Sequence, residues 1–138
     1  MVKIDKQAIV AAIKAAEAGT SGEIRVHLVK RCGVDALTEA KKVFSRLKMH
    51  KTKLRNGVLI LICIESRRFA IYGDQGIYEK TGHDFWDKTR DTMLEYLKEG
   101  HLKDGIIAGV ASAGEQLKHF FPIAGQNPNE LSDTITQS

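Results

Sequence analysis

The sequence has few of the features that indicate a metal-thiolate site, a secreted scaffold or a membrane protein. Its two cysteines, Cys32 and Cys63, form no CxxC pair, and no HExxH is present. We therefore expect neither a zinc site nor a disulfide framework, but two free buried thiols. The longest apolar run, Val58 to Ile64, is far shorter than the roughly 20 residues that span a bilayer. With no signal-peptide pattern at the N-terminus, we expect a soluble, cytoplasmic protein.

Motifs of several enzyme classes are also missing. There is no Walker-type GxxxxGK[ST], no GxSxG elbow and no DxDx[TV]-like aspartate pair. The loop that starts at Asp74 is not an EF-hand, because it lacks an oxygen ligand at its third position and glycine at its sixth. The histidines are scattered without metal-ligand spacing, so we expect them to be surface or half-buried polar residues.

What the sequence does contain is one well-patterned domain. Of its 138 residues, 43% are hydrophobic and 28% charged, which is typical of a single globular unit with its own core. The patterned part predicts one domain over residues 1–122. Residues 123–138 are polar and unpatterned, so we expect a disordered C-terminal tail.

Apolar periodicity predicts the order α-β-α-β-β-α-α. Helical spacing follows a capping Asp5, strict alternation marks Glu23 to Val29, and a second helical stripe follows from about Ala36. The remaining elements are an apolar strand after Asn56-Gly57, a strand at 69–72, a helix at about 83–98 and a last helix from about 104, with Asp104 as its N-cap, to 121. The expected fold is α/β, a small mixed sheet sandwiched by helices.

The strand directions place polar residues at one edge of this sheet. Strands one and two are separated by a helix and should run parallel, and strand three should return antiparallel to strand two. The starts of the first two strands, with Glu23 and Asn56, then lie beside the end of the third strand, with Asp74. The sequence therefore predicts that three oxygen-bearing side chains lie close together.

Three stretches in order, RNGVLILICI, RRFAIYGDQGI and a last helix that ends HFFP, resemble the TPM domain family. The family includes a thylakoid acid phosphatase, a photosystem II repair factor and a receptor modulator, and this chain resembles a stand-alone bacterial-type member. The resemblance covers about residues 3–122. It implies a Rossmann-like α/β sandwich, divalent-cation binding in some members, and phosphatase activity that is not general in the family.

Read with this resemblance, the turn Gly73-Asp74-Gln75-Gly76 is a candidate divalent-cation site. Asp74, Glu23 and Asn56 offer hard oxygen ligands, with Asp84 as a further candidate, and the expected ion is Ca²⁺, with Mg²⁺ as the alternative. The turn also has a purely structural interpretation, in which Asp74 bonds its own backbone and the glycines supply positive φ. Asp84 has one too, as an acid that favours a helix N-terminus.

Two other functions stay open. A metal-dependent acid phosphatase would use the same turn, with Arg55 or Arg68 close to the phosphate. Alternatively, the segment Lys41 to Arg55 holds seven Lys/Arg and no carboxylate, which suits a non-catalytic module that binds an acidic protein or a phosphorylated ligand. No RNA- or DNA-binding motif accompanies the basic segment, so we expect no specific nucleic-acid partner.

Overall fold

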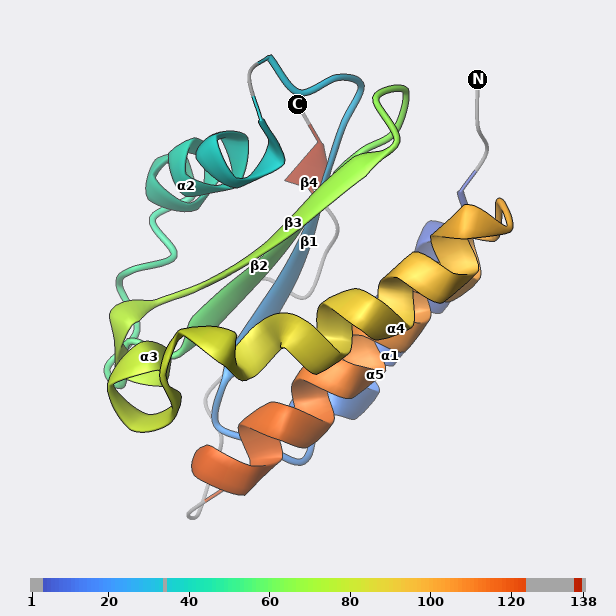
Figure 1. Ribbon diagram of the computed structural model, residues 1–138. Coiled ribbons are helices and arrows are strands. Elements are labelled where there is room, and N and C mark those ends of the chain that lie inside the picture. The colour runs from blue at the N-terminus through green and yellow to red at the C-terminus, as the bar shows by residue number, and fades with distance from the viewer. Residues whose placement is uncertain (1–3, 34, 124–135, 138) are drawn as a thin grey trace.

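The computed structural model describes residues 4–33, 35–123 and 136–137 (Figure 1). The helices are α1 (Lys6–Glu17), α2 (Ala36–Arg46), α3 (Gln75–Thr81), α4 (Asp87–Lys98) and α5 (Leu102–Phe120), with a 3-10 turn η1 (His83–Trp86) between α3 and α4. The strands are β1 (Glu23–Val29), β2 (Gly57–Cys63), β3 (Arg68–Gly73) and a two-residue β4 (Thr136–Gln137).

The sheet has the strand order β3-β2-β1-β4 and is mixed. β1 and β2 are parallel, with Glu23 opposite Gly57 and Val29 opposite Cys63. β2 and β3 are antiparallel, with Val58 opposite Gly73. The predicted fold class and the predicted directions of these three strands are confirmed.

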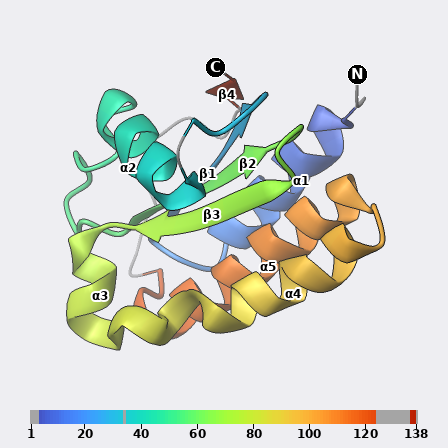
Figure 2. The ribbon, with the colours of Figure 1, turned by 45° about the horizontal axis from the view of Figure 1, so that its top comes forward.

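Helices cover both faces of the sheet (Figure 2). On one face, α1, α4 and α5 pack against the side chains of Ile24, Val26 and Leu28 from β1 and the matching alternate residues of β2. On the other face, α2 places Val43 and Phe44 against β2 and β3. The polar row of β1 is buried as well, since Glu23, Arg25 and His27 are all nearly inaccessible to solvent.

The region after β3 differs from the predicted helix pattern. Asp74 begins a further helix, α3, and the helix expected over about 83–98 divides into η1 and α4. The last helix starts at Leu102, with His101 at its N-cap position instead of Asp104. Within α3 only Ile77 is buried, so a seven-residue helix with one core residue gives no apolar period for sequence reasoning to detect.

The two cysteines are joined, and the expectation of free thiols was wrong. Cys32 and Cys63 form a disulfide, with their Cα atoms 5.6 Å apart. The parallel register explains the pairing, because Val29 at the end of β1 lies opposite Cys63 at the end of β2 and Cys32 follows three residues later. The two cysteines are far apart in the sequence, and only the parallel pairing of β1 with β2 brings them together.

The C-terminal end lies mostly outside the described residues, so the predicted disorder over 123–138 is not tested there. Thr136 and Gln137 pair in parallel with His27 and Leu28 as β4, a strand that the sequence pattern did not predict. Among the helices of the described residues, none has the length and apolar character to cross a membrane.

Candidate functional site

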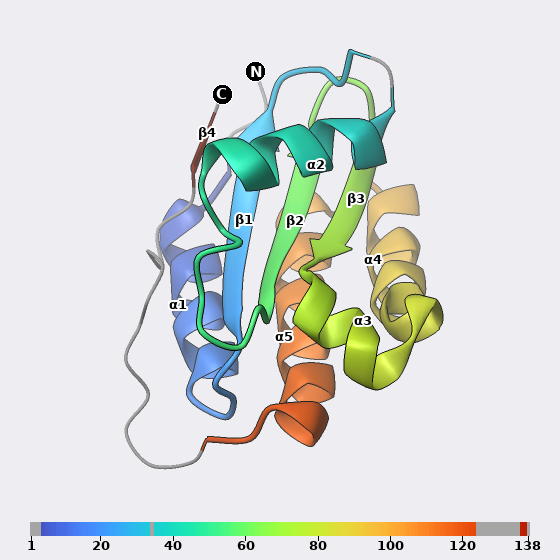
Figure 3. The ribbon, with the colours of Figure 1, turned by 90° about the vertical axis from the view of Figure 1, so that its left-hand side faces the viewer.

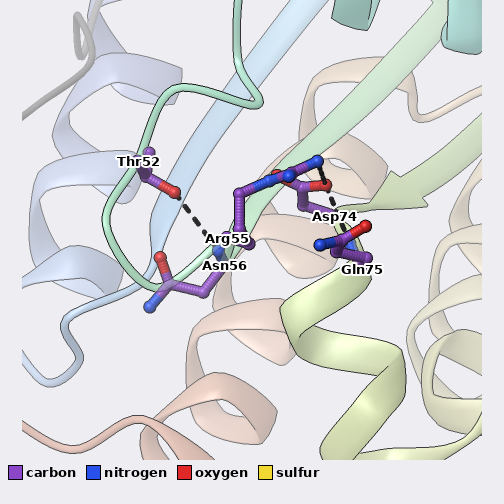
Figure 4. Close-up of polar contacts among 5 residues, drawn as sticks. All are labelled: Thr52, Arg55, Asn56, Asp74 and Gln75. Atoms are coloured by element: carbon purple, nitrogen blue, oxygen red, sulfur yellow. Dashed lines mark hydrogen bonds and ion pairs between the residues drawn. The ribbon is translucent and has the colours of Figure 1, made fainter.

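Asp74 lies at the junction of β3 and α3 and binds Arg55 through both carboxylate oxygens (Figure 4). Arg55 Nε donates to Oδ2 at 2.7 Å and Nη2 donates to Oδ1 at 2.8 Å. Oδ1 also accepts the N–H of Gln75 at 2.8 Å, and Asp74 is the N-cap residue of α3. A bidentate Arg–carboxylate pair is both strong and specific in orientation.

Gly76 lets α3 begin against the loop before β2. A Cβ atom at this position would lie 2.2 Å from the Leu54 carbonyl oxygen and 2.6 Å from that of Arg55. The Gly76 N–H instead donates to the Arg55 carbonyl at 2.9 Å. Among the described glycines, positive φ occurs at Gly82 and Gly100 and not at Gly73 or Gly76. Gly76 is therefore needed for the close approach of two backbone segments and not for its backbone angle.

Arg55 is held in an unusual backbone conformation beside the site. Its φ is 51°, in the left-handed region that costs a non-glycine residue about 1 kcal/mol. Its side chain is 38% exposed, whereas that of Asp74 is 5% exposed. The hydrogen bond with Asp74 raises the pKa of Arg55, and the charge of Glu79 and the hydroxyl of Tyr72 act in the same direction.

Asn56 lies at the same edge but points elsewhere. Its side chain is directed away from the Asp74 carboxylate in Figure 4, and Nδ2 donates to Ser21 Oγ at 3.4 Å. Its backbone N–H donates to Thr52 Oγ1 at 3.3 Å. The residue is buried, and these contacts hold the loop that carries Arg55.

Glu23 and Asp84 occupy different surroundings. Glu23 is buried at the start of β1, and its N–H donates to the Asn56 carbonyl at 3.4 Å. Burial lowers the pKa of the neighbouring Arg25, and the charges of Glu17 and Glu23 only partly oppose this shift. Asp84 lies exposed on η1.

The structure thus brings the backbones of Glu23, Asn56 and Asp74 to one edge, as predicted, while the Asp74 carboxylate faces Arg55. Within the described residues, no three His, Cys, Asp or Glu side chains gather as a metal-binding group. The sequence did not indicate Glu79 and Tyr72 as neighbours of Arg55. Glu79 could have been recognised from its position on α3, but the sequence pattern did not predict that helix.

The family model of the TPM domain matches residues 3–116. The chain belongs to the TPM domain family. No curated protein matches it.

Two solved structures are similar to this chain to different degrees. The BA42 protein from the psychrophilic bacterium Bizionia argentinensis is 45% identical, with a TM-score of 0.90, and the match covers 96% of this chain and 92% of BA42. The N-terminal domain of the cg2496 protein from Corynebacterium glutamicum is 19% identical, with a TM-score of 0.64, over 79% of this chain and 68% of the other. The second similarity shows the fold alone.

Proposed function

We propose that this TPM domain binds a divalent cation, Ca²⁺ or Mg²⁺, at the junction of β3 and α3, in competition with the side chain of Arg55. The observation that carries the proposal is the asymmetry of the ion pair. The Asp74 carboxylate is 5% exposed, while 38% of its partner's side chain is in solvent. A buried carboxylate needs a cation, and a half-exposed arginine side chain is able to leave.

The Asp74 carboxylate that binds the Arg55 guanidinium would bind the metal ion in its place. Asp74 supplies two carboxylate oxygens, Glu79 and Tyr72 lie close enough to act on the charge of Arg55, and waters would complete the shell. Glu23, Asn56 and Asp84 stay predicted ligands, and each would have to turn its side chain toward Asp74. A site with one or two direct carboxylates is expected to be weak and hydrated.

A titration of Ca²⁺ and Mg²⁺ followed by amide chemical shifts tests this proposal. Shifts should begin at residues 73–79, 22–23 and 55–57. Arg55→Gln removes the competing cation and should tighten binding at least about fivefold, because an unpaired buried carboxylate attracts the ion more strongly. Asp74→Asn should abolish binding.

Arg90→Gln is the matched control, because Arg90 also pairs with an aspartate, Asp87, but both side chains are 52% exposed. It should leave the affinity unchanged. Shifts confined to 84–95, or weaker binding in Arg55→Gln, would rule out the competition that we propose.

A phosphatase is the enzymatic form of the same proposal. A bound divalent cation would supply positive charge to phosphate oxygens and acidify a water molecule. Once released from Asp74, the Arg55 guanidinium would be free to bind the same oxygens in bidentate fashion. Turnover of p-nitrophenyl phosphate that disappears in Asp74→Asn, with the fold retained, supports this activity; equal turnover in the variant identifies a contaminant.

The basic segment Lys41 to Arg55 supports a second, non-catalytic function. Lys51 and Lys53 are exposed and form no ion pair within the described residues, and the neighbouring Leu54 is 56% exposed. Exposed cations around an apolar side chain suit an acidic protein surface or a phosphorylated ligand. Charge reversal at Lys51 and Lys53 should abolish binding of a phosphoserine peptide, and unaltered binding would exclude this surface. The cytoplasmic location expected from the sequence also remains a proposal.

A further inference from the structure

The outer edge of β3 has backbone groups that no neighbouring strand uses. The Asp74 N–H donates to the Gly57 carbonyl at 2.9 Å, and bonded positions alternate along an antiparallel pair. With the register of β2 and β3, the N–H and C=O groups of Phe69, Ile71 and Gly73 therefore point away from β2. Figure 3 shows β3 at the outer side of the sheet, with α2 on one face and α4 on the other.

Only one end of this edge is closed within the described part of the chain. The Gly73 N–H donates to the Tyr78 hydroxyl at 3.2 Å. The outward N–H and C=O groups of Phe69 and Ile71 have no hydrogen-bond partner among the described residues. Natural sheets normally cover or blunt such edges, because open backbone groups pair readily with another extended chain.

A groove of about 590 Å³ runs along these open groups. Leu37 and Lys41 of α2 line one wall, and Trp86 of η1 lines the other, with the backbone of β3 between them. The Trp86 indole N–H is buried and has no acceptor among the described residues. The groove therefore combines an aromatic wall with an unpaired strand edge.

The two walls of the groove differ in whether their positive side chains have acidic partners. Arg90, on the α4 side, binds Asp87 at 3.3 Å and Asp91 at 3.4 Å. Lys41, on the α2 side, forms no ion pair within the described residues, and its Nζ lies 6.0 Å from the centre of the Tyr72 ring. The uncompensated charge of the groove is therefore positive and lies on the α2 wall.

We propose that the edge of β3 binds an extended peptide by strand addition, with an acidic residue facing Lys41 and apolar residues on either side of it facing Phe69, Ile71 and Trp86. Successive side chains of an added strand point to opposite walls, which gives an alternating apolar and acidic pattern. Backbone hydrogen bonds supply affinity and the two walls supply selectivity. The walls on both sides of the edge favour a single chain over the whole sheet of a second copy, which would carry its own α2 and α4.

This interaction goes beyond the cation site and can be tested separately. The probe is a blocked seven-residue peptide of alternating isoleucine and glutamate, added to the full chain. The amides of Phe69 and Ile71 should shift and exchange more slowly with solvent, because they become hydrogen bonded. The same peptide with its four central amides N-methylated should not bind, since it lacks the donors of an added strand.

Charge reversal at Lys41 tests whether the acidic residues of the peptide face the α2 wall. Lys41→Glu should weaken peptide binding about fivefold, and a peptide with lysine in place of glutamate should recover it. Lys42→Glu is the matched control, because Lys42 is exposed on the same helix but does not line the groove, and it should change binding less than twofold.

Three results would overturn the proposal: no shift at Phe69 and Ile71 at about 1 mM peptide, the weakest binding of interest; equal binding of the N-methylated peptide; or equal losses in Lys41→Glu and Lys42→Glu. Sedimentation of the free chain should show a monomer. A dimer that protects the same two amides would assign the edge to a second copy instead.

Discussion

Two arginine–aspartate pairs of this domain have the same chemistry and different surroundings. Arg55 holds Asp74 by two hydrogen bonds of 2.7 and 2.8 Å, and the carboxylate side chain is 5% exposed. Arg90 lies 3.3 Å from Asp87, and both side chains are 52% exposed. The first pair joins a loop to the start of a helix, and the second lies on the exposed face of α4.

The difference shows that burial, more than pairing, decides what such a pair does. Exposed pairs contribute about 0–1 kcal/mol, because water replaces each partner at little cost. When one partner is removed from a buried pair, the other group is left without compensation. The Asp74 carboxylate therefore depends on a cationic partner, which is why our proposal places the competing metal ion there and not at Asp87.

The largest expected effect comes from Asp74→Ala. It removes the partner of Arg55 and the N-cap of α3, and we expect a loss of about 2–3 kcal/mol in the free energy of unfolding, less than for a fully buried pair because Arg55 keeps some water. Urea unfolding measures it. Asp74→Asn retains a capping oxygen and should lose less. If Asp74→Ala lowers the free energy of unfolding by less than about 0.5 kcal/mol, Asp74 behaves like an exposed aspartate and the two pairs do not differ.

Sequence reasoning succeeded where a repeated pattern spans a whole element. Alternation in Glu23 to Val29 and the apolar run after Asn56 correctly predicted β1 and β2, and their directions brought Asp74 to the right edge. These elements contribute many residues to the core, so their periods are long enough to detect.

The parts that failed depend on contacts between distant segments. The Asp74 carboxylate could equally have faced Glu23 or Asn56, because the side-chain direction is decided by Arg55, whose positive φ no local pattern predicts. Likewise, the alternation of β1 distinguishes two faces but does not reveal that the polar face is buried as well. Tertiary packing decided both.

A medium-sized effect is expected from the buried histidine of β1, in contrast with an exposed one. Burial, with the charges of Arg46 and Arg25, lowers the pKa of His27 from 6.5 to about 4. Between pH 6.5 and pH 4, His27 is protonated in the unfolded chain but stays neutral in the folded chain. The free energy of unfolding is therefore highest above pH 6.5 and falls as the pH drops toward 4. The loss is on the order of 3 kcal/mol.

His27→Gln should flatten this part of the stability curve measured by urea unfolding at several pH values. His101→Gln is the matched control, because His101 is 55% exposed beside Glu99, and it should leave the curve unchanged. If both variants keep the acid loss, another group titrates between pH 4 and 6.5, and burial of His27 is not its cause.

The smallest effect is expected from Asp87→Ala, which tests the exposed side of the comparison. Arg90 would keep Asp91 at 3.4 Å and its contact with water, so unfolding should change by less than about 0.5 kcal/mol. Salt should reduce even this difference, since exposed charges are screened within about 8 Å at physiological ionic strength.

Peptide binding in the β3 groove gives a second measurement of the Asp87→Ala variant, because Asp87 neutralises Arg90 there. Without Asp87, the α4 wall gains positive charge, and a peptide of alternating isoleucine and glutamate should bind slightly more tightly even though the fold is equally stable.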